Sequence, residues 1–518
     1  MGTPDQFLGV DVGATVVKAG LYGADGRCVA LSSAPAQAVT SALGFSERDM
    51  EGLWGAASDA IRDVLQAPNA RRAEVAAVGV TGFGNGLLLL DRAGDPVGNA
   101  IASTDSRAHL IVSEWLRLGH GDVIPSRTWQ TLWPGQPLAL FAWLERQAPE
   151  VVERAASLLM CKDFIRYRMT GEIAAELTDL SSAGLINGES GTYDLSILRT
   201  LGVERVFPLL PQRILLPSDV CGAVSPACAS RTGLAVGTPV VAGMADGLAL
   251  LLGSGVTDDG TLSIISGTWS LNQRLAAAPV LPEAVFGSIH TFDPQRFLVT
   301  DNSTAGASNL DWFVRIFMPL EGADADSRGR SIYAACDAAF DDVDPRDPAV
   351  VFLPFVHGSR EAPGATATFI GFTSWHRRSH ALRAVYEGVT FEHRRHVERL
   401  LASTGPARAV RLAGGVVASS VWIQLFADVL GLDIEVPAHA QLGALGAAMT
   451  AAVGVGAFKG YSEAARAMAS LAGVASPRPE LTELYTQRYG TYNELRESAI
   501  QFWLSQKPAD HVAIEAVK

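Results

Sequence analysis

Lysine and cysteine are scarce in this 518-residue chain, and each scarcity excludes a class of protein. Lys and Arg total 41 against 54 Asp and Glu, a formal net charge of −13. This balance argues against nucleic acid as the main partner, because phosphate neutralisation needs clustered cations. The lysines are Lys18, Lys162, Lys459, Lys507 and Lys518. None of them precedes Ser or Thr, so the sequence has no Walker A loop.

The five cysteines show no C-x-x-C spacing, and their odd number argues against a disulfide scaffold or a zinc ribbon. A reducing compartment, and therefore the cytoplasm, is expected. The first ten residues lack the basic and then apolar pattern of a secretory signal. The uncharged run 442–458 is at the short limit of a membrane span and rich in Ala and Gly, so we interpret it as a buried helix and expect no membrane partner.

The N-terminal segment has the pattern of a β-meander. Apolar runs at 7–12, 16–22 and 28–31 predict three strands, and Asp25-Gly26 is a hairpin signal between the last two. A helix follows from Met50, with Ser46 and Asp49 resembling a capping box. Alternating strands and helices predict an α/β layer fold with a mixed sheet.

The second half repeats this theme. Residues 260–265 and 269–274 predict two strands around a tight turn, and 409–413 predicts a strand that leads through a Gly-Gly turn into a helix at 420–430. Related opening hairpins indicate a duplicated fold with a boundary near 245–260. We therefore predict domains at 1–250 and 251–518.

Two hairpin turns and one Gly-Gly turn are candidate phosphate and nucleotide contacts. In Asp11-Val12-Gly13-Ala14-Thr15, small residues let backbone N–H groups approach phosphate, Thr15 and Lys18 add a hydroxyl and a charge, and Asp11 is a candidate Mg²⁺ ligand. Ser266-Gly267-Thr268 is a second such turn. Gly414 and Gly415, with Ser419 after them, are candidates for the adenosine side. In each case a purely structural turn is the alternative.

The candidate general base is Asp246, the single ionisable residue in the apolar run 239–255. Burial raises a carboxylate pKa and suits it to accept a proton. The alternative, a helix N-cap, is compatible with this role.

Candidate substrate contacts are Gly84 and Asn85 in a glycine-rich turn, because an amide can both donate and accept bonds to hydroxyl groups. Asp105 and Arg107 are expected to form an ion pair, with a helix cap and a surface Arg as the alternative. His393 and His396 are interpreted as part of a solvated helix face.

In order along the chain, these motifs resemble the FGGY carbohydrate kinases. The resemblance rests on segments 7–15, 78–91, 102–108, 242–246, 266–268, 412–431 and 441–448. It implies an actin-like fold of two ribonuclease-H-like domains around a catalytic cleft, with sugar mainly on the first domain and ATP mainly on the second.

The resemblance also implies the cofactors and the site residues. ATP is the co-substrate and Mg²⁺ the metal, held by Asp11; Asp246 is the base. The ATP contacts are Gly13, Thr15, Lys18, Gly267, Thr268, Gly414, Gly415 and Ser419. The sugar contacts are Gly84, Asn85, Asp105, Arg107 and Asp246. A homodimer is a further expectation.

Within the family, Ser46 to Met50, Gly98 to Ile101, Gln130 to Trp133 and Lys162 to Gly171 are similar to xylulose kinases of the L-xylulose type. Phe83-Gly84-Asn85 departs from the xylulose kinase pattern at a position that implies contact with sugar hydroxyls. The prediction is an ATP-dependent ketopentose kinase. The alternatives are a kinase of erythritol or ribulose, a non-enzymatic actin-like ATPase module and a sugar-binding sensor.

Overall fold

The computed structural model describes residues 6–40, 45–70, 75–267, 269–329, 331–347, 349–362 and 364–506. The chain forms two compact units. Unit 1 comprises the chain up to 259 together with 275–299 and 438–470, and unit 2 comprises 260–274, 300–437 and the chain from 471. Two later segments of the sequence thus return to unit 1.

The core of unit 1 is a mixed sheet that begins with the predicted meander. β1 (Gln6–Val12) pairs antiparallel with β2 (Val16–Gly23), and β2 pairs antiparallel with β3 (Cys28–Pro35). β1 also runs parallel to β6 (Val75–Gly82). Within the described residues the strand order is β12-β13-β6-β1-β2-β3, with β14 also paired to β6.

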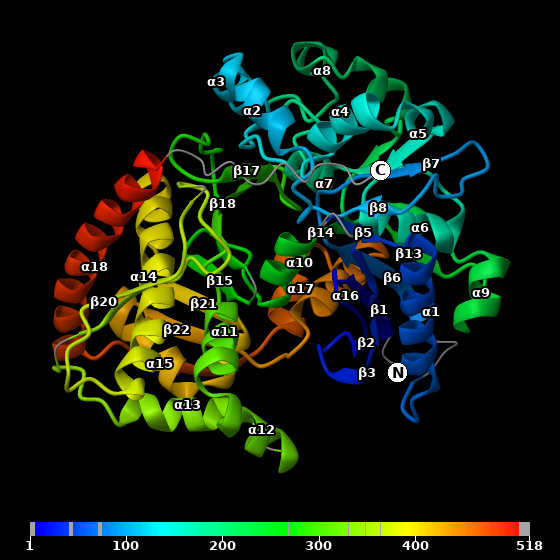
Figure 1. Ribbon diagram of the computed structural model, residues 1–518. Coiled ribbons are helices and arrows are strands. Elements are labelled where there is room, and N and C mark those ends of the chain that lie inside the picture. Colours follow the sequence, from blue (N-terminus) through cyan, green and yellow to red (C-terminus); the bar gives the residue numbers. More distant parts are fainter. Residues whose placement is uncertain are drawn as a thin grey trace. The chain divides into compact units, whose positions relative to one another are not determined.

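Helices cover both faces of this sheet (Figure 1). Leu8, Val10 and Val12 belong to the apolar cluster of α1 (Met50–Gln66). The alternate residues Phe7 and Gly9 face α16. The sequence alternation in β1 therefore supplies apolar side chains to both layers.

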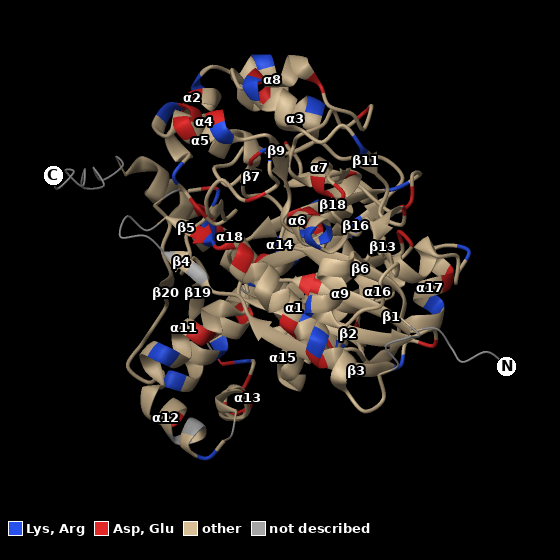
Figure 2. Cartoon of the chain, turned by 90° about the vertical axis from the view of Figure 1, so that its right-hand side faces the viewer, with Lys and Arg blue, Asp and Glu red and all other residues tan. Residues whose placement is uncertain are grey.

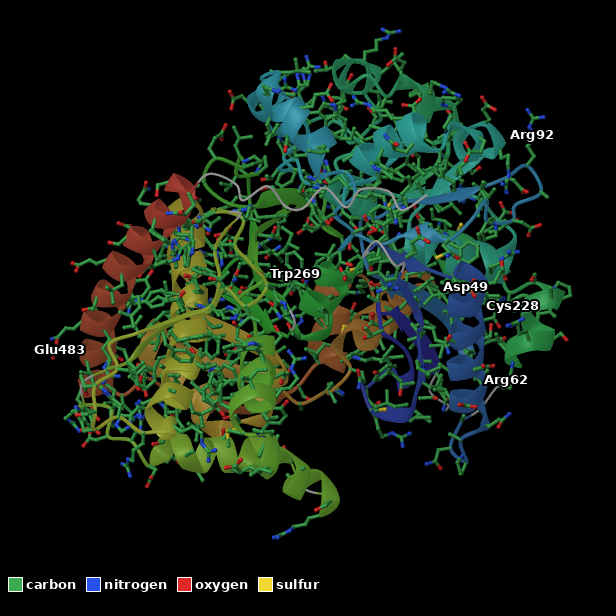
Figure 3. All side chains as sticks on the ribbon, in the orientation of Figure 1. Asp49, Arg62, Arg92, Cys228, Trp269 and Glu483 are labelled. Atoms are coloured by element: carbon green, nitrogen blue, oxygen red, sulfur yellow. The ribbon has the colours of Figure 1, made fainter. Side chains whose placement is uncertain are left out.

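Asp49, which Figure 3 labels, caps α1 by accepting a hydrogen bond from the Glu51 N–H at 3.0 Å. The predicted capping box led by Ser46 is wrong, because Ser46 lies in strand β5 and Asp49 itself occupies the N-cap position.

The predicted buried helix is confirmed as α16 (Leu442–Gly454), which is buried from Leu442 to Ala452. A Cβ atom at Gly9 or Gly79 would collide with backbone carbonyls of α16, so these glycines let the helix backbone lie directly on the sheet. Among the described residues, no helix is both long and apolar enough to cross a membrane.

A second sheet, whose order within the described residues is β17-β18-β16-β15-β21-β22-β23, supplies the core strands β15, β21, β22 and β23 of unit 2. β15 (Thr261–Ser266) pairs antiparallel with β16 (Ser270–Ala276) and parallel with β21 (Ala409–Gly414). β15 thus stands in this sheet where β1 stands in the first, between an antiparallel hairpin partner and a parallel strand. The predicted duplication is confirmed by this match.

In unit 2, α14 (Arg378–Thr404) contacts α15 (Ser420–Leu430), and α18 (Pro479–Ser505) packs on both. The interpretation of His393 and His396 as solvent-facing is wrong, because both are buried in α14. The His393 ring nitrogen Nδ1 lies 2.7 Å from Asn272 Oδ1, so a polar strand position accounts for this buried histidine.

Acidic and basic residues are interspersed on the visible surface; α1, for example, carries both (Figure 2).

The remaining elements are β4 (Ala38–Thr40), β5 (Ser46–Arg48), β7 (Leu88–Leu90), β8 (Ala100–Ile101), α2 (His109–Arg117), α3 (His120–Thr128), α4 (Pro137–Gln147), α5 (Pro149–Arg154), β9 (Ser157–Leu159), α6 (Cys161–Thr170), β10 (Ala175–Glu176), α7 (Leu177–Ser182), α8 (Leu195–Leu201), η2 (Glu204–Leu209), β11 (Ile214–Leu215), β12 (Val220–Ala223), α9 (Pro226–Thr232), β13 (Pro239–Val241), β14 (Met244–Ala245), α10 (Asp246–Gly253), β17 (Gly287–His290), β18 (Phe297–Ser303), α11 (Ser308–Phe317), α12 (Pro319–Ser327), α13 (Ile332–Asp341), β19 (Val351–Leu353), β20 (Thr368–Ile370), η3 (Gly415–Ala418), β22 (Asp433–Pro437), α17 (Tyr461–Met468) and β23 (Leu471–Ala475).

Candidate active site

Three neighbouring strands of unit 1 end at one edge of the sheet. In the register of β1, β6 and β14, Asp11 and Met244 both lie opposite Thr81. The Thr81 hydroxyl donates to the Met244 carbonyl at 2.7 Å and fixes this alignment. Two strand spacings span about 10 Å. The sheet therefore brings Asp11 close to Asp246, which follows β14 directly.

Asp246 is the first residue of α10, and its Oδ1 accepts from the Gly247 N–H at 2.7 Å. Burial, and then the negative charges of Asp11 and Asp179, raise the pKa of Asp246 to about 7. A carboxyl group that titrates near neutral pH and keeps some accessible surface can accept a proton from a ligand hydroxyl.

Asp11 faces the N-terminus of α16. A Cβ atom on Gly443, in the first turn of that helix, would collide with the Asp11 carboxylate. Lys18 is the register partner of Asp11 across the hairpin. Burial raises the pKa of Asp11, and the Lys18 charge opposes this rise.

The turn between β1 and β2 is closed by its own backbone. The Gly13 N–H donates to the Val16 carbonyl at 3.1 Å, and Arg48 Nε donates to the Ala14 carbonyl at 3.0 Å. Thr15 is exposed at the tip. The Gly13 N–H is thus engaged in the turn, and the exposed Thr15 is the turn residue most open to a ligand.

The equivalent turn of unit 2 also has a backbone bond of its own, in which the Gly267 N–H donates to the Trp269 carbonyl at 3.1 Å. Trp269, which Figure 3 labels, has an exposed fraction of 37%. Thr268, also predicted as an ATP contact, lies outside the described residues.

The Gly-Gly turn of unit 2 follows β21. Gly414 has a φ of +95°, and a Cβ atom there would collide with the Ser266 carbonyl, so this position favours glycine twice over. Gly415 has open space around its Cα. Ser419 caps α15, accepting from the Trp422 N–H at 3.0 Å and donating to Asp337 Oδ1 at 2.8 Å.

The glycine-rich turn after β6 holds Asn85 in the left-handed region, with a φ of +61°. A Cβ atom at Gly84 would lie 3.6 Å from Asp179 Oδ1 and 3.8 Å from Ser182 Oγ. The predicted pair Gly84 and Asn85 therefore adjoins α7.

The predicted ion pair between Asp105 and Arg107 is present, with Arg107 Nη2 at 2.9 Å from Asp105 Oδ2. Asp105 also accepts from the Ser46 N–H at 2.7 Å, and Arg107 reaches Glu47 at 2.8 Å. The guanidinium carbon lies 4.2 Å from the centre of the Phe45 ring. Both residues thus tie the segment around Ser46 to the rest of unit 1.

Sequence reasoning missed a buried charged cluster around Lys162. Its Nζ lies 2.8 Å from Asp163, 3.0 Å from Asp179 and 3.3 Å from Glu176. Burial alone would lower the pKa of Lys162, but these carboxylates raise it. The sequence contains only a weak signal for this cluster, because Glu176 and Asp179 stand in a segment that also contains Glu172, Thr178 and two serines.

The cluster supports Asp246 through the backbone. Glu176 Oε2 accepts from the Thr178 hydroxyl at 2.8 Å. The same hydroxyl accepts from the Ala245 N–H at 2.9 Å. Residue 245, just before Asp246, is therefore anchored to a fully buried carboxylate.

The donor set near Asp11 suits Mg²⁺, which prefers carboxylate, phosphate and water oxygens. Among the described residues, no group of three His, Cys, Asp or Glu side chains could hold a metal without other ligands. A magnesium ion at Asp11 would therefore take most of its ligands from phosphate and water.

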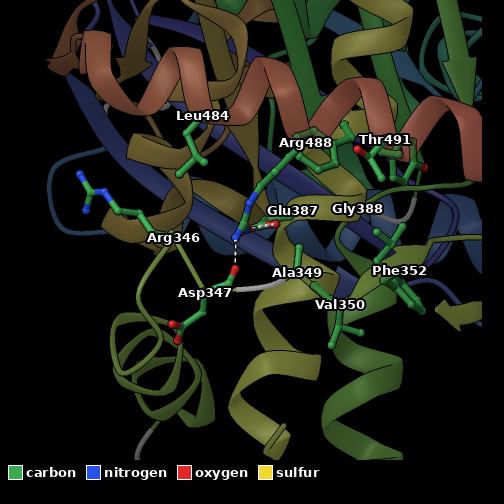
Figure 4. A pocket seen from close by; sticks show the side chains of 14 residues that line it. Arg346, Asp347, Ala349, Val350, Phe352, Glu387, Gly388, Leu484, Arg488 and Thr491 are labelled. Atoms are coloured by element: carbon green, nitrogen blue, oxygen red, sulfur yellow. Dashed lines mark hydrogen bonds and ion pairs between the residues drawn. The ribbon is translucent and has the colours of Figure 1, made fainter. Parts of the chain in front are cut away.

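A separate cavity of about 310 Å³ lies in unit 2 between α14, α18 and residues 346–347 and 349–352 (Figure 4). Arg488 projects into it and donates to both carboxylate oxygens of Glu387, at 2.8 and 2.9 Å, and to the Asp347 carbonyl at 2.7 Å. The guanidinium is thus already paired within the protein.

Solved structures with the same fold include a gluconate kinase from Lactobacillus acidophilus, 24% identical with a TM-score of 0.87 over 97% of this chain and 99% of that one. A xylulose kinase from Rhodospirillum rubrum is 26% identical with a TM-score of 0.86 over 96% of this chain and 99% of that one. The predicted actin-like fold of two related α/β units is confirmed.

Sequence relatives cover nearly the whole chain. A probable L-xylulose kinase of Pasteurella multocida is 32% identical over 95% of this chain and 98% of its own length. The L-xylulose/3-keto-L-gulonate kinase of Escherichia coli is 33% identical over 94% and 96%. Models of the N- and C-terminal domains of the FGGY family of carbohydrate kinases match residues 6–253 and 262–455. The chain therefore belongs to the FGGY family of carbohydrate kinases and is an ATP-dependent sugar kinase, as its motifs predicted.

Proposed function

We propose that the protein transfers the γ-phosphate of ATP to a hydroxyl group of a ketopentose, with L-xylulose as the preferred substrate. The observation that carries this proposal is the Asp246 carboxyl group, with a pKa of about 7, beside Asp11 at the edge of the unit 1 sheet. The choice of sugar is supported by the relatives that are L-xylulose kinases.

In the proposed reaction, Asp246 accepts the proton of the attacking hydroxyl group. A bond forms between that oxygen and the γ-phosphorus, the bond from the γ-phosphorus to the bridging oxygen breaks, and ADP leaves. Magnesium, when bound, neutralises phosphate charge, and Asp11 would hold it through water. Gly84 and Asn85 position the sugar, with Asp105 and Arg107 as further predicted contacts.

The proposed ATP contacts are Thr15, Lys18 and the turn that Gly13 shapes, together with Gly267, Thr268, Gly414, Gly415 and Ser419. The domain assignment at 1–250 for sugar and 251–518 for ATP remains part of this proposal, as do a cytoplasmic location and a homodimer.

The test is a sugar panel with Mg-ATP in a coupled assay for ADP. L-xylulose, D-xylulose, both ribuloses, erythritol and a sugar-free sample are compared. We expect L-xylulose to have the highest kcat/KM. A preference for ribulose or erythritol would reassign the substrate, and ATP turnover indifferent to every sugar would contradict the kinase proposal.

A variant of the proposed base, Asp246, tests its role in proton transfer. Asp246→Asn keeps the shape of the side chain, and we expect kcat to fall at least about 10²-fold while ATP still binds. A variant with near-normal sugar phosphorylation would remove Asp246 from the mechanism.

A further inference from the structure

Two buried oxygen atoms beside the glycine-rich turn of unit 1 have no hydrogen-bond partner. They are Oδ1 of Asn85 and Oδ1 of Asp179; Asp179 Oδ2 also accepts no hydrogen bond but forms an ion pair with Lys162 at 3.0 Å. The Asp179 side chain is only 1% exposed. A buried acceptor without a donor is costly, so such atoms call for a ligand or another functional reason.

The two acceptors belong to one small region. The absent side chain of Gly84 leaves room in front of Asp179, because a Cβ atom there would lie 3.6 Å from Asp179 Oδ1. Asn85 is the next residue, and its backbone adopts the left-handed conformation with a φ of +61°. Ser182 Oγ, 3.8 Å from the same Cβ position, adds a hydroxyl group.

Asp179 is held in place by contacts with Lys162 and Glu176. Its Oδ2 lies 3.0 Å from Lys162 Nζ, and its backbone N–H donates to Glu176 Oε2 at 3.2 Å. Burial raises the pKa of Asp179, and the Lys162 ammonium opposes this rise and favours the charged carboxylate, whose Oδ1 is an acceptor. It remains unpaired because Lys162 and Glu176 engage only the other atoms.

We propose that Asp179 is a sugar-specificity residue whose Oδ1 accepts a hydrogen bond from one substrate hydroxyl, while Asn85 Oδ1 accepts from a second. This inference rests on the proposed function. Two acceptors suit a ligand with two hydrogen-bond donors, and the hydroxyl groups of a polyhydroxylated, uncharged sugar supply them. A carboxylate or phosphate group at this place would have no proton to donate and would be repelled by Asp179.

The test compares Asp179→Asn with Asp163→Asn. Both changes remove one negative charge from a buried neighbour of Lys162, but Asp163 Oδ1 is already bonded to Lys162 and Arg166, each at 2.8 Å. Binding of L-xylulose is measured by titration calorimetry, and ATP KM and melting temperature are measured in parallel.

We expect Asp179→Asn to weaken sugar binding at least about tenfold, as for loss of a hydrogen bond to a charged group. Asp163→Asn should bind sugar within about twofold of the wild type. Equal sugar affinity in the two variants would overturn the proposal and make Asp179 a structural partner of Lys162 alone.

Deoxy-xyluloses, each lacking one hydroxyl group, identify the bond. For the analogue that lacks the Asp179 partner, wild type and Asp179→Asn should bind equally, whereas an unchanged tenfold difference for every analogue would overturn the assignment. If the aspartate variants do not fold, Asn85→Gly suits the same backbone and removes the second acceptor. Tenfold weaker binding supports the shared site, and unchanged binding overturns it.

The experiments can refute the proposed kinase function and the proposed role of Asp179 independently of each other. A wild type that binds a ketopentose through Asp179 but does not phosphorylate it would refute the proposed function and support this inference. A wild type that phosphorylates the sugar, with Asp179→Asn binding it normally, would do the reverse. A wild type that binds no uncharged sugar would overturn both.

Discussion

Among single residues, Asp246 has the clearest chemical consequence, because its pKa of about 7 lies within the working pH range. The groups that face it are Asp11 and Asp179, and both raise this pKa. Since the raised pKa means that the base gains its proton as pH falls through about 7, we expect kcat/KM to drop about tenfold per pH unit below that value.

Measuring this pH profile for the wild type and for Glu176→Gln tests the assignment. Burial also raises the pKa of Glu176 to about 7, but that group caps α7 and has no assigned part in proton transfer. The variant should keep the fall in activity below pH 7, and a flat profile in the wild type down to pH 5.5 would contradict a base with this pKa.

At Gly443, the absence of a side chain leaves room for the Asp11 carboxylate. In Gly443→Ala the new Cβ atom would collide with the Asp11 carboxylate. We expect kcat to fall at least about tenfold, because small displacements of a positioned group are costly. Gly490→Ala, in α18 with open space around it, is the control and should leave kcat unchanged.

At the scale of an element, the start of α15 serves two purposes if Ser419 lines the adenosine site. Ser419→Ala removes the N-cap and should lower the free energy of unfolding by about 1 kcal/mol. Ser331→Ala removes the same kind of cap from α13 and should cost about as much.

The KM for ATP separates the two roles of Ser419. It should rise in Ser419→Ala and stay at the wild-type value in Ser331→Ala, as measured in the same coupled assay. An ATP KM unchanged in both variants would leave Ser419 with its structural role as a helix cap.

At the scale of the whole molecule, unit 1 depends on the charge of Lys162, which is fully buried among three carboxylates. Lys162→Met leaves those carboxylates without their cation. We expect the free energy of unfolding to fall by about 3–5 kcal/mol, measured by urea denaturation. The exposed Lys459→Met should change it by less than about 0.5 kcal/mol, and equal effects would contradict the cluster's role.

Local patterns determined much of the architecture. The apolar runs of β1 and β2, the Asp25-Gly26 turn and the uncharged helix α16 could be read directly, because strand pairing and helix burial follow from short-range patterns. The same holds for α15, whose bounds Ser420–Leu430 agree with the predicted helix.

The sequence by itself determined the family and the order of the loops, and it singled out Asp246 as the proposed base, because these depend on local motifs and on one lone carboxylate. Only the tertiary structure decided which groups surround that carboxylate. The alignment of Asp11 with Met244 arises from strand register over more than two hundred residues of chain, and Lys162 gathers its carboxylates from α6, β10 and α7. Such proximity is set by packing between distant segments, which residue spacing along the chain does not encode.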